Sequence, residues 1–440
     1  MSPIHAERVL AIGAGLSGLA TARALSGRGL AVTVLEAKDR VAEPWRARHP
    51  ALRLNIHRKF AGLPGQPAPR ADGIYLKRDT VVRHLERYAA QLDAPIHFGT
   101  EVTEIVRVAD GWQVTATTGV YRAAHIVIAT GRESLPHIPD WPGRKTFEGE
   151  LLHVGDLGDV SRFDGKRVLV VGAGNSGTDA LNHLAAHRPK AVMVSVRNGP
   201  AIVPRSIFGY PIHGLARLFA ALPVKVTDPA FKLTERLLLG DLRRHGLTSH
   251  PEGGSTRLLR DGVTFAIDDG FVAALKSGRF RIVPQIERLD GSRVVLNDGT
   301  SREVDVIIAA TGYRTRLEPL LGHLGVLDEN GRPIHAMGER DPDNPGLWFT
   351  GFKPIFTGFF DASGIAAKRI ASGIEVDVAE ASARRDNGGA RARLVGRSSM
   401  RMRRPTAKDR RSPVARRITT NPHAGGSPAR ASKSRTEWMD

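Results

Sequence analysis

The sequence predicts an α/β protein with two Rossmann-like dinucleotide-binding domains, the second inserted into the first, together with small antiparallel β elements. Two glycine-rich turns, about 160 residues apart, each follow an apolar strand and open a helix. Each half of the chain later returns through an apolar strand that ends in Ala-Thr-Gly. These repeated features indicate two related folding units, each of which is expected to hold one dinucleotide.

The first turn follows the apolar residues 9–12, and residues 13–18 read Gly-Ala-Gly-Leu-Ser-Gly. A pyrophosphate binds well at a helix N-terminus, where backbone N–H groups lack partners, and glycine lets the backbone approach it closely. The strand that ends in Ala-Thr-Gly at 129–131 is expected to run back beneath the bound dinucleotide. The residues predicted to contact the dinucleotide here are Gly13, Gly15, Leu16, Ser17, Gly18 and Gly131.

The second turn follows the apolar residues 168–171, and residues 172–179 read Gly-Ala-Gly-Asn-Ser-Gly-Thr-Asp. The same strand-to-helix context makes an isolated glycine turn the weaker interpretation. The residues predicted to contact the second dinucleotide are Gly172, Gly174, Asn175, Ser176, Gly177, Thr178 and Asp179.

The two units differ at the end of the second strand. In the first unit this strand ends in Glu36, whose carboxylate can accept hydrogen bonds from a ribose diol, as FAD or NAD requires. In the second unit the strand ends with Ser195, closely followed by Arg197, and a guanidinium suits the 2′-phosphate of NADPH. We therefore interpret the first unit as the FAD site and the second as the NADPH site. A solvated surface role is the alternative for Arg197.

Composition excludes several classes of protein. The chain contains no cysteine, which excludes flavoenzymes with a redox-active dithiol and metal sites with cysteine ligands. It has no apolar run long enough to span a membrane and no signal peptide, so we expect a cytoplasmic protein. The net charge is +19, and 16 of the 64 Lys and Arg residues, but only 4 of the 45 Asp and Glu residues, follow position 380.

The domain organisation follows from these patterns. The predicted parts are the first part of the FAD domain at 1–160, the NADPH domain at 161–290, the second part of the FAD domain at 291–380, and a disordered basic tail at 381–440. For the tail, contact with nucleic acid or another anionic surface is the alternative to a merely solvated extension. The apolar stretch 209–242 is predicted to be helical. Ordinary packing, a roof over a substrate cavity and contact with a membrane surface are its three interpretations.

Short motifs resemble one family. Residues 147–153 read Phe-Glu-Gly-Glu-Leu-Leu-His, which fits the F-x-G-x-x-x-H signature of the class B flavin monooxygenases. Further segments resemble the plant YUCCA indole-3-pyruvate monooxygenases and their bacterial relatives, among them Pro44-Trp45-Arg46, Leu54-Asn55 and Val203-Pro204-Arg205. The resemblance covers residues 5 to 375, and the tail has no counterpart in it.

The resemblance implies an FAD- and NADPH-dependent monooxygenase. Such an enzyme inserts one atom of O2, through a C4a-hydroperoxyflavin, into a small organic substrate such as an α-keto acid, an amine or a sulfide. It places Pro44 and Trp45 beside the flavin and makes Asn55 the predicted catalytic residue, close to both flavin and nicotinamide. A turn-stabilising role is the alternative for Asn55. His153 is expected to arrange the linkers between the domains, and Leu157 stands where Baeyer–Villiger enzymes carry a tryptophan, which disfavours ketone oxidation.

Two other functions stay open from the sequence. An NADPH-dependent flavin reductase or oxidase would pass electrons to a quinone or to oxygen without inserting an oxygen atom. A basic binding protein would use residues 381–440 on nucleic acid and retain the flavin as a structural group.

Overall fold

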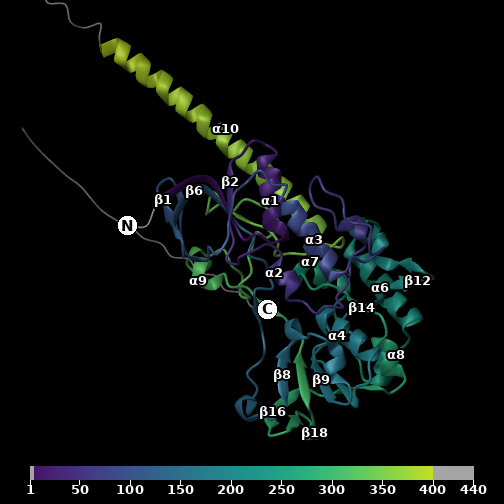
Figure 1. The fold of residues 1–440 in the computed structure, drawn as a ribbon. Coiled ribbons are helices and arrows are strands. Elements are labelled where there is room, and N and C mark those ends of the chain that lie inside the picture. The colour runs from purple at the N-terminus through teal and green to yellow at the C-terminus, as the bar shows by residue number, and fades with distance from the viewer. Residues whose placement is uncertain (1–3, 400–440) are drawn as a thin grey trace, which may run out of the picture. The chain divides into compact units, whose positions relative to one another are not determined.

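The computed structural model describes the backbone of residues 4–399 and the side chains of residues 8–384 (Figure 1). The chain divides into two compact units, residues 1–381 and 382–440. The first unit contains two parallel sheets, each built around one of the glycine-rich turns. The predicted α/β class with two Rossmann-like domains is confirmed.

The first sheet has seven strands in the order β3-β2-β1-β6-β5-β4, and β21 pairs with the second half of β6. The parallel strands of this sheet are β1 (Ile4–Ile12), β2 (Val32–Leu35), β3 (Ile96–His97), β6 (Gly119–Ile128) and β21 (Leu347–Phe349). Antiparallel to β6 runs a hairpin of β4 (Val102–Val108) and β5 (Gly111–Ala116), as the alternating pattern predicts.

The second sheet has five parallel strands in the order β15-β10-β9-β19-β8. Its strands are β8 (Glu150–His153), β9 (Arg167–Val171), β10 (Ala191–Ser195), β15 (Phe280–Val283) and β19 (Val306–Ala309). One face is covered by a three-stranded antiparallel sheet of β16 (Ile286–Asp290), β17 (Arg293–Leu296) and β18 (Ser301–Glu303).

Sheet membership corrects two predicted domain boundaries. The predicted boundaries place β8 (within 1–160) and β19 (within 291–380) in the FAD domain. Both strands lie in the second sheet instead. The physical reason is that a returning strand pairs beside the strand of its own glycine turn: β19 pairs with β9 in the same way that β6 pairs with β1. Within residues 1–381, the half built on the second sheet therefore extends from β8 to β19.

Helices cover the remaining faces of the two sheets. The helices are α1 (Leu16–Ser26), α2 (Glu43–Arg46), α3 (Arg78–Ala89), α4 (Asn175–Ala185), α5 (Ala216–Ala221), α6 (Val224–Leu238), α7 (Gly254–Asp261), α8 (Phe271–Lys276), α9 (Glu318–Leu321) and α10 (Phe359–Ser399). Short 3-10 helices are η1 (Arg58–Phe60), η2 (Arg144–Thr146), η3 (Val154–Asp156), η4 (Val160–Phe163), η5 (Ile212–Leu215), η6 (Leu242–His245) and η7 (Gly322–Leu324). α1, α3 and the first part of α10 share one core on the first sheet, and α4 and α8 share a core on the second.

Three short strand pairs complete the fold. β11 (Ile202–Pro204) pairs with β14 (Ala266–Asp268), and β12 (Ser206–Ile207) pairs with β13 (Tyr210–Pro211). β7 (Leu135–Pro136) pairs antiparallel with β20 (Tyr313–Arg314). β7 lies on the connection that leaves the first sheet for the second, and β20 lies on the connection that returns, so the two linkers run side by side.

The C-terminal helix continues where the sequence predicts disorder. α10 extends to Ser399, so residues 382–399 are helical; their five arginine and three alanine residues favour a helix, whereas their three glycine residues oppose one. The rest of the predicted disordered tail, residues 400–440, lies outside the described part of the chain. None of the described helices is long and apolar enough to cross a membrane.

One ion pair fixes β19 against β9. The Arg167 guanidinium donates to both carboxylate oxygens of Asp305, at 3.1 and 2.6 Å, and the Arg167 backbone N–H donates to the same carboxylate at 2.7 Å. These hydrogen bonds hold the pKa of Asp305 at about 2. The pair therefore contributes stability above the ordinary carboxyl pKa, and this contribution is lost as the pH falls from about 4 towards 2.

We expect Asp305→Asn to lower the free energy of unfolding at pH 7 by about 1 kcal/mol, because the Asp305 side chain is 35% exposed and solvent screens the pair. Urea unfolding at pH 7 and at about pH 2.5 measures this. The difference between the two proteins should be clearly smaller at about pH 2.5 than at pH 7, whereas the exposed Asp290→Asn should resemble the wild type at both. A difference of the same size at the two pH values contradicts the assignment.

Candidate dinucleotide sites and their junction

Both glycine turns have the backbone that a dinucleotide cradle requires. Gly13 has φ +105° and Gly172 has φ +97°, a region that favours glycine. A Cβ on Gly18 would lie 1.8 Å from the carbonyl oxygen of Gly13, and one on Gly177 would lie 2.0 Å from that of Gly172. The third glycine of each turn therefore allows the helix to rest directly on the turn.

The second glycine of each turn faces open space. A Cβ on Gly15 or Gly174 would meet no protein atom within 4 Å. These glycines are the N-caps of α1 and α4, and neither helix has a side-chain cap. Unpartnered N–H groups at the start of a helix attract an anion, so both turns fit a pyrophosphate.

The returning strands pass directly beneath the turns, as expected. A Cβ on Gly13 would lie 2.7 Å from the carbonyl oxygen of Ala129, and one on Gly172 would lie 2.5 Å from that of Ala310. Gly131, two residues after Ala129, has φ +78°, which allows the chain to turn away from the first site.

The first turn is surrounded by residues from distant parts of the chain. The Glu36 carboxylate accepts from the backbone N–H groups of Ala14 at 2.6 Å and Lys38 at 2.9 Å, which places it at the edge of the cradle. The Ser17 hydroxyl lies 2.7 Å from that of Ser363 at the start of α10. Trp45 packs near Phe360, with ring centroids 6.2 Å apart. Leu16 is half-buried, and Pro44 is exposed.

The second turn receives the predicted catalytic residue. Asn55 donates from Nδ2 to Oδ1 of Asn175, the first residue of α4, at 2.7 Å. A Cβ on Gly358, just before α10, would lie 2.6 Å from Cγ2 of the neighbouring Ile56. The loop that carries Asn55 is thus in contact with the N-terminal ends of both α4 and α10.

Several side chains predicted to contact the second dinucleotide form hydrogen bonds within the protein. Thr178 is fully buried, and its hydroxyl donates to the carbonyl oxygen of Ala173 at 2.9 Å. The Ser195 hydroxyl is also buried and donates to the carbonyl oxygen of Pro284 at 2.9 Å. Ser176 is half-buried. Arg197 is exposed, and no hydrogen bond or ion pair joins its guanidinium to the described residues.

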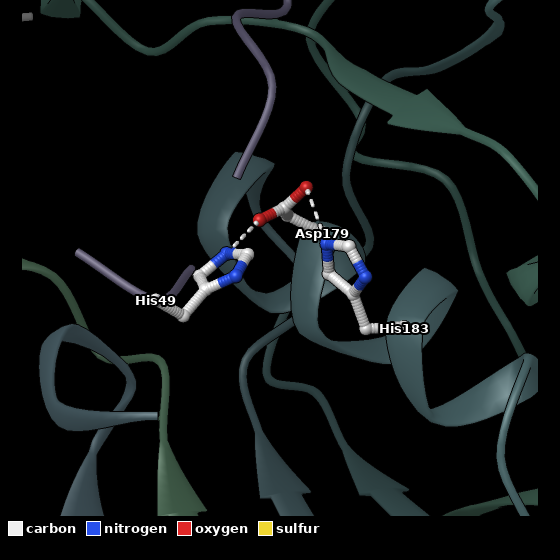
Figure 2. Close-up of side chains that lie close together, drawn as sticks. All are labelled: His49, Asp179 and His183. Carbon is white, nitrogen blue, oxygen red and sulfur yellow. Dashed lines mark hydrogen bonds and ion pairs between the residues drawn. The ribbon is translucent and has the colours of Figure 1, made fainter. Parts of the chain in front are cut away.

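Asp179 faces two histidines (Figure 2). His49 Nε2 donates to Asp179 Oδ2 at 2.9 Å, and His183 Nε2 lies 3.8 Å from Oδ1. The two imidazole rings meet edge to face, with centroids 4.7 Å apart, and burial lowers the pKa of His183. The Asp179 carboxylate therefore joins α4 to the loop that follows α2, while its contact with the dinucleotide stays a prediction.

His153 connects the two linkers between the sheets. Its Nδ1 accepts from the Gly155 N–H at 3.0 Å, so Nε2 carries the proton and donates to the carbonyl oxygen of Gly312 at 2.9 Å. Burial lowers the pKa of His153, and its ring packs edge to face on Tyr313 at 4.6 Å. Both nitrogens of a neutral imidazole are in use, which supports the predicted linker role and excludes a general base.

Sequence reasoning missed the residues that join the two sheets. Arg48 donates to the Tyr313 hydroxyl at 2.6 Å and pairs with Glu133, while His49 reaches Asp179. Arg48 and His49 lie close after the Pro44-Trp45-Arg46 motif in the sequence. This closeness was the signal that could have identified them. Ser363 had no signal, because only the folded chain brings the start of α10 to α1.

Comparison with known proteins decides the family. The rice indole-3-pyruvate monooxygenase YUCCA1 (Oryza sativa subsp. japonica) is 36% identical over 322 residues, which cover 72% of this chain and 79% of the relative. The chain belongs to the YUCCA-like flavin monooxygenases. The probable indole-3-pyruvate monooxygenase YUCCA3 of Arabidopsis thaliana is 31% identical over 371 residues, covering 81% of this chain and 84% of the relative. As a YUCCA-like protein the chain is a flavin-dependent monooxygenase, and the resemblance found in the sequence is confirmed.

A broader family model and solved structures agree with this assignment. The model described as pyridine nucleotide-disulphide oxidoreductase matches residues 10–206, although a dithiol has no counterpart in this cysteine-free YUCCA-like chain. A double mutant of the flavin monooxygenase of Stenotrophomonas maltophilia has a TM-score of 0.65 at 21% identity, covering 84% of this chain and 99% of that one. Cyclohexanone monooxygenase from Rhodococcus sp. Phi1, bound to NADP+, has a TM-score of 0.59 at 20% identity, covering 85% of each chain. These two likenesses show a shared fold.

The glycine geometry predicts effects of different size for two neighbouring substitutions. We expect Gly177→Ala to lower the free energy of unfolding by about 2 kcal/mol or more, because its Cβ would overlap the backbone of Gly172. Gly174→Ala, with open space around it, should cost less than about 1 kcal/mol. Chemical unfolding of both variants measures the difference, and equal stabilities would contradict the packing role of Gly177.

Proposed function

We propose that the first turn binds FAD, that the second binds NADPH, and that the enzyme uses both to insert one atom of O2 into a small organic substrate. Bound FAD supplies the redox chemistry that activates oxygen, and NADPH supplies the reducing equivalents. The observation that carries the proposal is the hydrogen bond from Asn55 to Asn175 at the start of α4, because the same loop also contacts Gly358, just before α10, through Ile56.

The first cradle supports FAD through the range of elements that surround it. Glu36 stands at the end of β2, where a carboxylate can bind a ribose diol. The start of α10, held to α1 by Ser17 and Ser363, brings a second helix N-terminus to the same site. Its partial positive charge would favour the electron-rich end of a reduced flavin.

The second cradle supports NADPH through Arg197. Its exposed guanidinium follows β10, at the position where an acidic residue would select a free 2′-hydroxyl. A guanidinium forms charge-assisted hydrogen bonds to a phosphate. Ser195 stabilises the end of β10, because its hydroxyl donates to the carbonyl oxygen of Pro284.

Asn55 is the residue that we propose acts at the reacting atoms. Its amide can donate to groups bound at either cradle, and its half-buried loop limits the entry of water. With Asn55 in place, reducing equivalents would be directed to the substrate and not lost as hydrogen peroxide.

For the substrate, we propose an α-keto acid of the indole-3-pyruvate type. This proposal is supported by the YUCCA relatives, which are named for that activity. Amines and sulfides are the next compounds to test. The reaction is expected to take place in the cytoplasm, and assay of each compound for NADPH consumption, oxygen use and product identifies the substrate. A reductase or oxidase would release hydrogen peroxide with every compound.

We expect the wild type to prefer NADPH strongly over NADH, and Arg197→Ala to reduce that preference by about ten- to a hundredfold in kcat/KM through the loss of a charge-assisted contact. Stopped-flow measurement of flavin reduction with each nicotinamide provides the test. Arg302→Ala, which removes an exposed arginine on β18, should leave the preference unchanged. Equal use of NADH and NADPH by the wild type would refute the assignment of Arg197.

We expect Asn55→Ala to retain FAD and to be reduced by NADPH, while the ratio of product to hydrogen peroxide falls about tenfold, as the loss of one buried hydrogen bond implies. Parallel assays of NADPH, product and peroxide measure this ratio. The exposed Asn330→Ala serves as the control. Unchanged coupling in Asn55→Ala would return Asn55 to a structural role in its loop.

A further inference from the structure

A concentrated apolar surface lies over residues 208–238. More than half of the large apolar side chains that are exposed in the described part of the chain fall within this segment. Phe208 is 95% exposed, Tyr210 80% and Leu237 73%. We name the set the apolar face, and its members are Phe208, Tyr210, Leu215, Leu218, Leu222, Val226, Leu233, Leu237 and Leu238. Such a concentration of exposed apolar side chains on one segment indicates an interaction site.

The segment that carries the apolar face is a well-packed unit. The inner sides of the β12–β13 hairpin, α5 and α6 meet in one core that contains Ile207, Phe219 and Phe231. The rings of Phe219 and Phe231 lie 4.8 Å apart, and Phe231 also packs on Phe265 at 4.5 Å. The exposed side chains therefore form the outer side of a fixed structure, which Figure 1 shows in teal around α6 and β12.

α6 presents two different stripes to solvent. At 3.6 residues per turn, Val226, Leu233 and Leu237 fall on one side of the helix, and all three are exposed. The exposed Lys225, Lys232 and Arg236 are each adjacent in sequence to one of them, and they form the neighbouring stripe. Thr227 and Phe231 point to the core.

Every exposed charge in residues 206–240 is positive. The exposed cations are Arg217, Lys225, Lys232 and Arg236. The two acids of the segment are engaged by the protein: Asp228 accepts from the N–H of Ser255 at 2.7 Å, and Glu235 accepts from the hydroxyl of Ser249 at 2.9 Å. An apolar stripe beside a cationic stripe is the arrangement of a helix that lies in the surface of an anionic bilayer.

We propose that the apolar face binds the surface of an anionic lipid membrane. The exposed side chains of α6 and the tip of the β12–β13 hairpin enter the boundary between headgroups and acyl chains, and the four cations contact lipid phosphates. A second copy of the chain fits this surface less well, because a two-fold interface would bring like charges together with no exposed acid to pair with them.

The test compares the full-length enzyme with the double variant Leu233→Gln and Leu237→Gln, which retains every charge of the chain. Co-sedimentation is measured with vesicles of phosphatidylcholine alone and with vesicles that also contain phosphatidylglycerol. We expect the wild type to bind only the anionic vesicles well and the double variant to bind them more than about tenfold more weakly. Ile334→Gln is a matched control, because Ile334 is exposed to 58% and Leu233 to 57%. It should bind as the wild type does.

A second measurement locates the inserted residues. The chain contains no cysteine, so Leu237→Cys and Ile334→Cys each provide a single site for an environment-sensitive fluorophore. We expect a blue shift on anionic vesicles at position 237 and none at 334. Equal binding by the wild type and the double glutamine variant would overturn the proposal and assign vesicle binding to other basic residues. If the wild type is a dimer that does not bind vesicles, and the double variant is a monomer, the proposal is overturned and the apolar face binds a second copy of the chain.

Discussion

The close approach of a helix start to the turn before it is the constraint on which this structure depends. At Gly18 and Gly177 the absence of a side chain lets α1 and α4 rest on the carbonyl oxygens of Gly13 and Gly172. That contact directs each helix axis, and with it the unpartnered N–H groups, at the space beside Gly15 and Gly174. The same geometry occurs twice, so the two cradles are built by one physical rule.

The proposed reaction site lies between the two sheet-based halves of residues 1–381. The Asn55 loop is held from the side of the apolar face as well as from the cradles: His213 Nδ1 accepts from the His57 N–H at 3.1 Å, and Lys59 Nζ donates to the carbonyl oxygen of Gly214 at 2.5 Å. Burial lowers the pKa of His213 to about 4, which keeps it a neutral acceptor at physiological pH. Hydrogen bonds therefore connect the Asn55 loop to η5, the short helix that ends in Leu215 of the apolar face.

The sequence predicted the parts of the molecule that follow local rules. Both glycine turns, their flanking strands and the β4–β5 hairpin depend on short patterns of glycine and apolar residues, and the structure has them where they were predicted. Such short patterns do not predict contacts between segments that lie far apart in the sequence. Asp179 belongs to a glycine motif, yet its partner His49 lies 130 residues away, and only tertiary packing shows that the carboxylate is occupied. The membership of β19 in the second sheet likewise depends on long-range pairing.

The pairing of β7 with β20 has a mechanical consequence. A domain connected by one strand can rotate about that strand. Two adjacent antiparallel strands form a hydrogen-bonded ribbon that resists such rotation. The N–H of His137 donates to the carbonyl oxygen of Gly312 at 3.0 Å, and His153 ties the returning strand again at the same carbonyl. Twisting such a ribbon strains both strands and their hydrogen bonds together, while bending it across its flat face is comparatively easy. The paired linkers therefore favour bending over twisting between the two halves.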